Sequence, residues 1–193
     1  MKLVILDYGA GNVKSVQFAC KRLGFDAVIS NNAEVLKRAD KVIFPGVGEA
    51  SSAMKKLKGK QLDHVIKNLE QPVLGICLGM QLMCRYTEEG TTQGLGIFDV
   101  SVKKFAPTVK VPHIGWNTIS GLKTSLFKGV SEASYVYLVH SFYAEKSNET
   151  TALTTYGVDY SSALQKANFF GVQFHPEKSG DVGELILNNF LTL

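Results

Sequence analysis

Residues 71–81 read Gln-Pro-Val-Leu-Gly-Ile-Cys-Leu-Gly-Met-Gln, and this stretch decides how the rest of the chain is interpreted. A hydrophobic strand pattern runs straight into Cys77, and a helical pattern begins directly after it. Gly75 and Gly79 stand two residues before and after the cysteine, as in the G-x-nucleophile-x-G turn that hydrolases build around serine. Such a tight turn strains the backbone of the nucleophile, and side chains two residues away would collide. The stretch therefore predicts a strand-to-helix turn that presents a reactive thiol.

The first half of the chain repeats this alternation of strands and helices. Strands are expected at residues 2–7, 25–30, 41–44 and 72–76, and helices at 13–23, 32–39 and 57–69. After about Thr91 the expected strands are shorter and richer in Gly, Thr and Ser, at residues 97–104, 116–119, 135–140, 151–156, 163–166 and 171–174. A last amphipathic helix is expected over 182–191. The pattern predicts one α/β domain over residues 1–193, with a mostly parallel central sheet, helices on both faces and an antiparallel addition in the C-terminal half.

The composition is that of an ordinary globular protein. Of 193 residues, 45% are hydrophobic, and 21 Lys and Arg against 17 Asp and Glu give a net charge of +4. This excludes a disordered chain, and no basic block indicates nucleic-acid binding. No hydrophobic run approaches the ~20 residues of a membrane span, and the first residues lack the features of a signal peptide. Three cysteines form no disulfide framework, so we expect a cytoplasmic protein.

The position of Cys77 at a helix start favours its reactivity. The helix dipole and the free N–H groups there stabilise a thiolate, and the N–H of Leu78 would face the oxyanion of a tetrahedral intermediate. The alternative is a small core residue, as most cysteines are. That alternative suits Cys20 and Cys84, which lie in hydrophobic surroundings, whereas the paired glycines favour a functional Cys77.

The best candidate for a general base is His175, one of four histidines. Pro176 favours an extended conformation at His175, and residues two apart in extended chain project the same way. Glu177 can therefore lie beside the imidazole, fix its tautomer and stabilise its protonated form. His64 is expected to be a solvated residue on a helix surface.

Other sites find weaker support in the sequence. His175 and Glu177, together with His113 or His140, have none of the spacings of zinc sites, so no metal is expected. The segments Gly9-Ala10-Gly11 and Gly46-Val47-Gly48 do not satisfy the dinucleotide fingerprint, so no cofactor is expected.

Five segments in order along the chain carry a family resemblance. Gly75–Gln81 and Phe174–Glu177 resemble class I, triad-type glutamine amidotransferases. Further segments resemble the glutaminase subunits of imidazole glycerol phosphate synthases: Leu6-Asp7-Tyr8-Gly9-Ala10-Gly11-Asn12, Pro45-Gly46-Val47-Gly48, Pro112-His113-Ile114-Gly115-Trp116-Asn117 and Val172–Ser179. The matches run from residue 6 to residue 179, nearly the whole chain.

The resemblance implies a three-layer, flavodoxin-like amidotransferase domain that hydrolyses glutamine to glutamate and ammonia. It implies that Cys77 attacks the side-chain amide, that His175 moves the protons and that Glu177 orients His175. The oxyanion hole would be formed by Leu78 and Val47. The implied substrate-binding residues are Gly46, Gly48, Gln81, Glu89, Ser141 and Phe142. For Gln81 and Glu89, an exposed helix face is the alternative interpretation.

The resemblance also implies a partner. In the family, ammonia passes to a cyclase subunit, a (β/α)₈ barrel, which makes imidazole glycerol phosphate and aminoimidazole carboxamide ribotide in histidine biosynthesis. The expected interface residues are Asn12, Ser15, His113, Trp116, Tyr137 and Lys178. Aromatic and basic residues are typical of interface hot spots, although each of these could equally serve local packing.

Three alternatives stay open at this point. The chain could supply ammonia to a different synthase, although such glutaminases differ in the N-terminal region and in residues 113–117. It could be a stand-alone cysteine amidohydrolase, which would need no partner. It could also be a non-catalytic subunit, but the presence of Cys77, His175 and Glu177 together argues against that.

Overall fold

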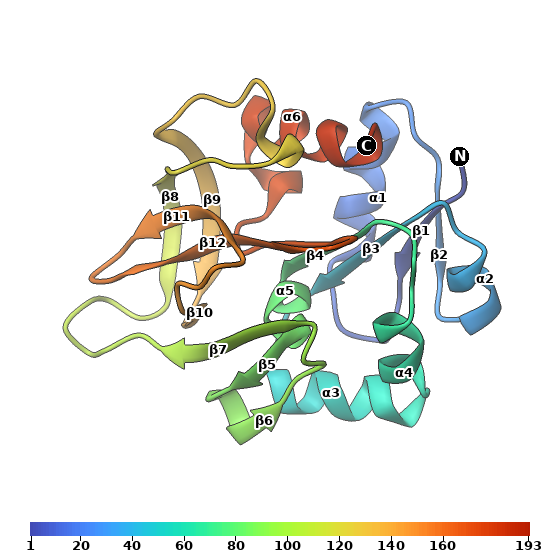
Figure 1. Ribbon diagram of the computed structural model, residues 1–193, viewed down its shortest axis with the longest axis horizontal. Helices are drawn as coiled ribbons and strands as arrows, with labels where there is room; N and C mark the ends of the chain where they lie inside the picture. The colour runs from blue at the N-terminus through green and yellow to red at the C-terminus, as the bar shows by residue number, and fades with distance from the viewer.

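The computed structural model describes all residues, 1–193, and is built around one large twisted sheet (Figure 1). The strand order is β2-β1-β3-β4-β13-β12-β10-β7-β5-β6, and β11 pairs with β12. The first five strands in this order are mutually parallel; they are β1 (Leu3–Leu6), β2 (Ala27–Ser30), β3 (Lys41–Gly46), β4 (Val73–Cys77) and β13 (Phe169–Val172). The order of β1 to β4 is that of flavodoxin-like folds, so the predicted fold class is confirmed.

Strand β1 shows how the sequence builds three layers. Leu3 and Ile5 pack into one hydrophobic cluster, and Val4 and Leu6 pack into another on the opposite face. The first cluster is covered by α1 (Val13–Arg22) and α6 (Gly180–Leu191), and the second by α3 (Ala50–Gly59), α4 (Leu62–Lys67) and α5 (Leu78–Met83). Figure 1 shows the two helix groups on opposite sides of the sheet. A strand that is hydrophobic at every position is thus buried on both faces.

The helices of the first half differ from expectation at one place. The Asn32 side chain accepts the N–H groups of Glu34 and Val35 and so begins α2 (Ala33–Lys37), as predicted. The single helix expected over residues 57–69 is wrong, because α3 begins earlier, after Glu49, and a break at Gln61 separates it from α4. Gln61 has a φ of 55°, a left-handed conformation that interrupts a helix.

The C-terminal half supplies the antiparallel strands. On the main sheet these are β6 (Thr92–Gln93), β10 (Phe142–Ala144), β11 (Thr150–Thr155) and β12 (Asp159–Lys166); β7 (Phe98–Lys104) pairs antiparallel with β10 and parallel with β5 (Cys84–Thr87). A separate ribbon is formed by β8 (His113–Ile119) and β9 (Ser134–His140). The 3-10 turns are η1 (Glu89–Thr91), η2 (Ser125–Phe127) and η3 (Pro176–Lys178).

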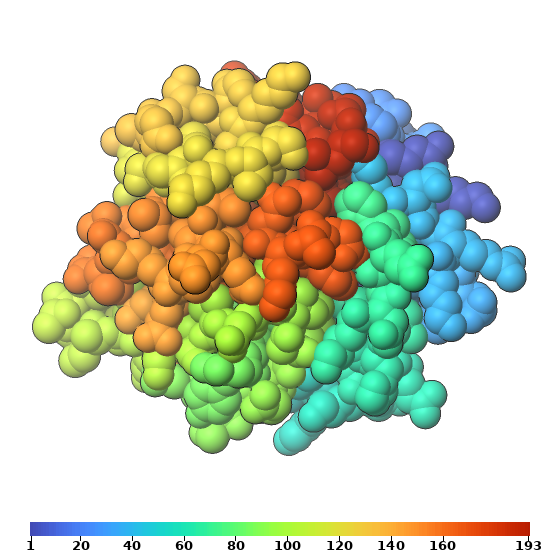
Figure 2. All heavy atoms as spheres, in the orientation of Figure 1, coloured from blue at the N-terminus to red at the C-terminus, as the bar shows by residue number.

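Figure 2 shows the N-terminal residues, in blue, at the right-hand side and residues 120–165, in yellow and orange, over the upper left, with the C-terminal residues, in red, between them at the top. None of the helices is both long enough and hydrophobic enough to cross a membrane.

Candidate active site

Cys77 lies at the corner between β4 and α5, where the sequence pattern predicted a strained turn. Its φ of 53° and ψ of −111° are unusual for a residue with a side chain. The two glycines have the expected steric reason: a Cβ on Gly75 would lie 2.6 Å from the sulfur of Met83, and a Cβ on Gly79 would lie 1.8 Å from the carbonyl oxygen of Phe44. Glycine at both positions therefore lets α5 pack directly against the sheet behind the cysteine.

His175 follows β13 and is held by Glu177 at the start of η3. The imidazole Nδ1 lies 2.8 Å from a carboxylate oxygen of Glu177, and both side chains are almost completely buried. The N–H of His175 donates to the carbonyl of Tyr137 on β9, and the carbonyl of His175 accepts the hydroxyl of Ser179. The backbone of His175 and the Nδ1 atom of its ring are thus held, whereas Nε2 has no hydrogen-bond partner within the protein. That nitrogen is free to exchange a proton with a reacting group.

The charge state of His175 is set by its neighbours. Burial alone would lower the pKa of His175, but the interactions with Cys77 and Glu177 outweigh it and raise the pKa to about 10. This direction of the pKa shift favours the imidazolium beside the sulfur, the form of the ring that pairs with a thiolate. The other two cysteines are different, because burial raises the pKa of the Cys20 thiol to about 12 and also raises that of Cys84. Both stay protonated and unreactive.

A cavity of about 260 Å³ opens at Cys77. It is lined by Val47, Gly48, Cys77, Leu78, Gln81, Glu89, Pro112, Val139, His140, Ser141, Phe142 and His175. The structure thus brings together nine residues that the sequence analysis proposed, from elements far apart in the chain. Two of the proposed catalytic and substrate-binding residues do not line it. Glu177 lies behind His175, and the backbone of Gly46 packs against Gly79 and Leu78. The N–H of Val47 has no hydrogen-bond partner in the chain, as an oxyanion-hole donor requires.

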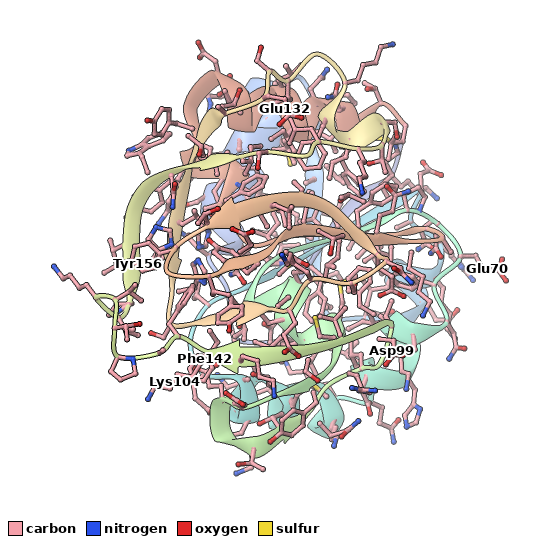
Figure 3. All side chains as sticks on the ribbon, turned by 60° about the vertical axis from the view of Figure 1, so that its left-hand side comes forward. Glu70, Asp99, Lys104, Glu132, Phe142 and Tyr156 are labelled. Carbon is pink, nitrogen blue, oxygen red and sulfur yellow. The ribbon has the colours of Figure 1, made fainter.

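Neither Gln81 nor Glu89 lies on an exposed helix face. Gln81 is buried, and its amide nitrogen donates to the carbonyl of Phe142 and to the side-chain oxygen of Gln173. Glu89 lies in η1, where its carboxylate accepts the N–H of Ala50 at the start of α3. Burial raises the pKa of Glu89. Figure 3 shows Phe142 beside Lys104, its partner on β7.

Two polar residues of this site escaped the sequence analysis. Gln173 is fully buried, and its amide nitrogen lies 3.6 Å from the sulfur of Cys77. It stands two residues before His175, so the alternation of extended chain already placed both side chains on one side. His140 was considered only as a metal ligand. It is buried between the carbonyl of Phe142 and the hydroxyl of Tyr160, and burial lowers its pKa to about 3.

Comparison with known proteins assigns the chain to a family. Residues 4–193 match the family described as glutamine amidotransferase class-I. The chain belongs to this family. It is 59% identical to the imidazole glycerol phosphate synthase subunit HisH of Bacteroides fragilis over the full length of both chains. It is 44% identical to the protein of the same name from Haemophilus influenzae, over 99% of this chain and 97% of that protein.

Solved structures agree on the fold. This amidotransferase superposes with a TM-score of 0.77 on the crystal structure of a putative GMP synthase protein from Thermoplasma acidophilum, at 21% identity, covering all of this chain and 92% of that one. A second crystal structure, titled as a glutamine amidotransferase, gives a TM-score of 0.76 at 17% identity over 98% of this chain and 97% of that one.

The residues expected at a partner interface fall into three places in this amidotransferase. Trp116 and Tyr137 pair across the β8–β9 ribbon with ring centroids 6.0 Å apart, and the Lys178 amine lies 5.8 Å from the Tyr137 ring. Asn12 caps α1 by accepting the N–H of Ser15.

His113 does not lie on the surface where an interface residue was expected. Its ring stacks on Tyr156 at 3.8 Å and lies inside an aromatic cluster with Phe105 and His140. Figure 3 shows Tyr156 at the end of β11. The reason is register: in the ribbon His113 pairs with His140, and both side chains point to the covered face. No group of three or more His, Cys, Asp or Glu side chains is arranged to hold a metal ion.

Proposed function

We propose that this chain is the glutaminase subunit of an imidazole glycerol phosphate synthase, which releases ammonia from L-glutamine through a thioester on Cys77. One observation carries the proposal: a thiol on a strained strand-to-helix turn opens into the same cavity as a histidine held at 2.8 Å by a buried carboxylate. The 44–59% identity to HisH subunits over the full chain supports the choice of synthase.

The reaction follows from the positions of three side chains. The Cys77 thiolate attacks the amide carbon of glutamine, and the carbonyl oxygen becomes an oxyanion that the N–H groups of Leu78 and Val47 stabilise, each by about 3 kcal/mol. The imidazolium of His175 then protonates the leaving ammonia. In the second half, His175 takes a proton from water, the hydroxide cleaves the thioester, and glutamate leaves. Cys77 regains its starting state, and Glu177 keeps the imidazole in place throughout.

The cavity supplies groups for the rest of the substrate. We assign the Glu89 carboxylate to the α-amino group of glutamine, and Gln81, Gly48 and the backbone of Ser141 and Phe142 to the remaining polar atoms. All of these residues line the cavity. Gly46, which does not line it, is instead needed for the close packing of β3 against α5.

We assign the outer face of the β8–β9 ribbon to the partner, a cyclase subunit with a (β/α)₈ barrel. Ile114, Trp116 and Tyr135 on this face are 60%, 55% and 60% exposed, which is unusual for large hydrophobic side chains that lie close together. The ribbon also borders the site, because Val139 of β9 lines the cavity. Ammonia released at Cys77 would have a short path to a partner docked here.

Two further assignments complete the proposal. We propose that residues 1–193 form one amidotransferase domain, since the family match spans 4–193 and the main sheet combines strands from both halves of the chain. We place the protein in the cytoplasm, where its three free cysteines would stay reduced.

The first test is affinity labelling with a glutamine analogue, followed by peptide mass spectrometry. Label is expected on Cys77 alone, with Cys20 and Cys84 as internal controls in the same molecule. Ammonia release from glutamine should fall to background in Cys77→Ala while the thermal unfolding midpoint is preserved. Wild-type turnover in that variant would reject the mechanism.

The second test separates the glutaminase subunit from a stand-alone amidohydrolase. Glutamine hydrolysis is measured with the isolated chain and again after addition of the cyclase subunit with its ligand. We expect slow hydrolysis by the isolated chain and a large stimulation by the complex. Full activity without the partner, unchanged on its addition, would favour the stand-alone enzyme.

A further inference from the structure

Gln173 is the polar residue of the site that the reaction above leaves without a role. It follows β13, its main-chain N–H donates to the carbonyl of Ser162, and its side chain is fully buried. A buried amide must satisfy its hydrogen-bonding groups, and here its nitrogen lies 3.6 Å from the sulfur of Cys77. We propose that Gln173 stabilises the Cys77 thiolate by donating a hydrogen bond to it. The proposal rests on the proposed function, because it concerns the same nucleophile.

The orientation of the Gln173 amide follows from its neighbours. The Phe142 carbonyl, which can only accept, lies 2.9 Å from Gln81 Nε2 and 2.7 Å from His140 Nδ1. This fixes the NH₂ end of Gln81 toward Phe142. The same NH₂ group lies 2.8 Å from Gln173, so the atom facing it must be the Gln173 oxygen. The NH₂ group of Gln173 is then directed at the sulfur.

The other neighbours of the sulfur cannot replace this donor. The Val139 carbonyl, 3.9 Å away, accepts from a thiol but repels a thiolate. The imidazolium of His175 interacts with the sulfur, but it gives up its proton to the leaving ammonia. Gln173 is neutral and keeps its hydrogens at every stage. A hydrogen bond to a charged group contributes more than one between neutral groups, which suits the thiolate of the resting enzyme and the thiolate that leaves when the thioester is cleaved.

The contacts also connect the nucleophile to the substrate pocket. Gln81 bonds Gln173, and Gln173 bonds Cys77, so a substrate that engages Gln81 acts on the sulfur through only two hydrogen bonds. Removal of Gln173 should therefore lower kcat more than it raises KM, because the lost interaction is with the nucleophile.

The test is Gln173→Met, which keeps the length of the side chain and removes the donor. The readout is the rate of iodoacetamide alkylation at Cys77 as a function of pH, followed by peptide mass spectrometry of the full chain. The midpoint of the acid limb should move up by about one pH unit, since a hydrogen bond to a charge contributes ~1.5 kcal/mol or more. Gln71→Met is the matched control, because the Gln71 amide bonds the Leu36 carbonyl before β4. Its profile should equal that of the wild type.

The alkylation profile isolates the pair of interest. Besides His175, the titratable groups near the sulfur include Tyr8 and Tyr160, and burial raises the pKa of both above the range of the assay. His140 interacts with His175, but burial lowers the pKa of His140 to about 3. All three stay neutral. Glu89 also lines the cavity and its pKa is raised by burial, but neither Gln173 substitution alters it, so a difference between variant and wild type reports on Cys77 and His175.

A second variant covers the case in which Gln173→Met does not fold. Gln173→Leu is also uncharged and also lacks the donor, so the midpoint should rise by a similar amount. A wild-type midpoint in either folded variant overturns the proposal, even if glutamine hydrolysis is normal. Absence of glutaminase activity in the wild type together with the cyclase subunit and its ligand would instead reject the function, and the alkylation profile would still decide whether Gln173 acts on the sulfur.

Discussion

Gly79→Ala tests whether the close packing behind the nucleophile is essential. A methyl group at this position would lie 1.8 Å from the carbonyl oxygen of Phe44, which belongs to the backbone of β3. An ordinary carbon–oxygen contact is about 3.3 Å, so β3 and α5 must separate by more than ~1 Å. Because both are backbone segments of the core, no side-chain rotation can relieve the contact.

The structure sets the expected size of the effect. Overpacking a core costs about 1–3 kcal/mol and sometimes more, and a backbone contact belongs at the upper end. Alanine has a higher helix propensity than glycine, which stabilises α5 by up to ~1 kcal/mol and offsets part of this cost. A net loss of about 2 kcal/mol corresponds to a decrease of roughly 4–8 °C in the unfolding midpoint of a chain of this size. Phe44 lies three residues before Val47, so the N–H of Val47, a proposed oxyanion donor, should move as well. A displacement of ~1 Å can reduce turnover about 10²-fold.

The assays are thermal unfolding and glutamine hydrolysis in the presence of the cyclase subunit. The control is Gly59→Ala, the same change at an exposed position of α3 with no atom near the added methyl group. It should stabilise the protein by about 0.5–1 kcal/mol and leave turnover unchanged. If Gly79→Ala unfolds within about 1 °C of the wild type and hydrolyses glutamine normally, the packing argument is refuted.

Three further outcomes follow from the site. Burial lowers the pKa of His140 to about 3, below the ~6.5 of an unfolded chain, so its contribution to stability is complete above pH ~6.5 and decreases by about 2 kcal/mol at pH 5. Urea titrations should show that the free energy of unfolding decreases less between pH 6.5 and pH 5 in His140→Gln than in the wild type. An equal decrease would contradict this. Glu177→Gln removes the charge that stabilises protonated His175, so kcat should fall about 10²–10⁴-fold, whereas an unchanged kcat would exclude that role. Trp116→Ala should weaken cyclase binding about 30-fold by calorimetry, and Val28→Ala on the edge strand β2 should not; equal affinities would move the interface elsewhere.

The parts of this fold that the sequence predicts are those with local causes. Cys77 between two glycines is a local steric pattern, and the structure shows the strained φ that it requires. Asn32 begins its helix with its own side chain. The prediction of a single helix over residues 57–69 was wrong, because nothing in the hydrophobic pattern indicates that Gln61 adopts a left-handed conformation.

The parts that could not be predicted depend on contacts between distant segments. Gln81 looks like a surface residue in sequence, but the strand containing Phe142 covers it. His113 lies in a motif with exposed Trp116, and only the ribbon register, with odd and even positions on opposite faces, shows that the histidine is buried. Periodicity gives the faces of a strand but not what lies against them.

The peptide groups of Tyr137 link the β8–β9 ribbon to the backbone of His175 by hydrogen bonds. The Tyr137 N–H donates to Ser179 Oγ, whose hydroxyl donates to the His175 carbonyl, while the Tyr137 carbonyl accepts the His175 N–H. The side chain of the same residue packs against Trp116 on the outside. A protein bound to the outer face of this ribbon would therefore contact the residue that holds the backbone of His175. Tyr137 alone thus connects the exposed face of the ribbon, through its side chain, with the backbone of His175, through its peptide groups.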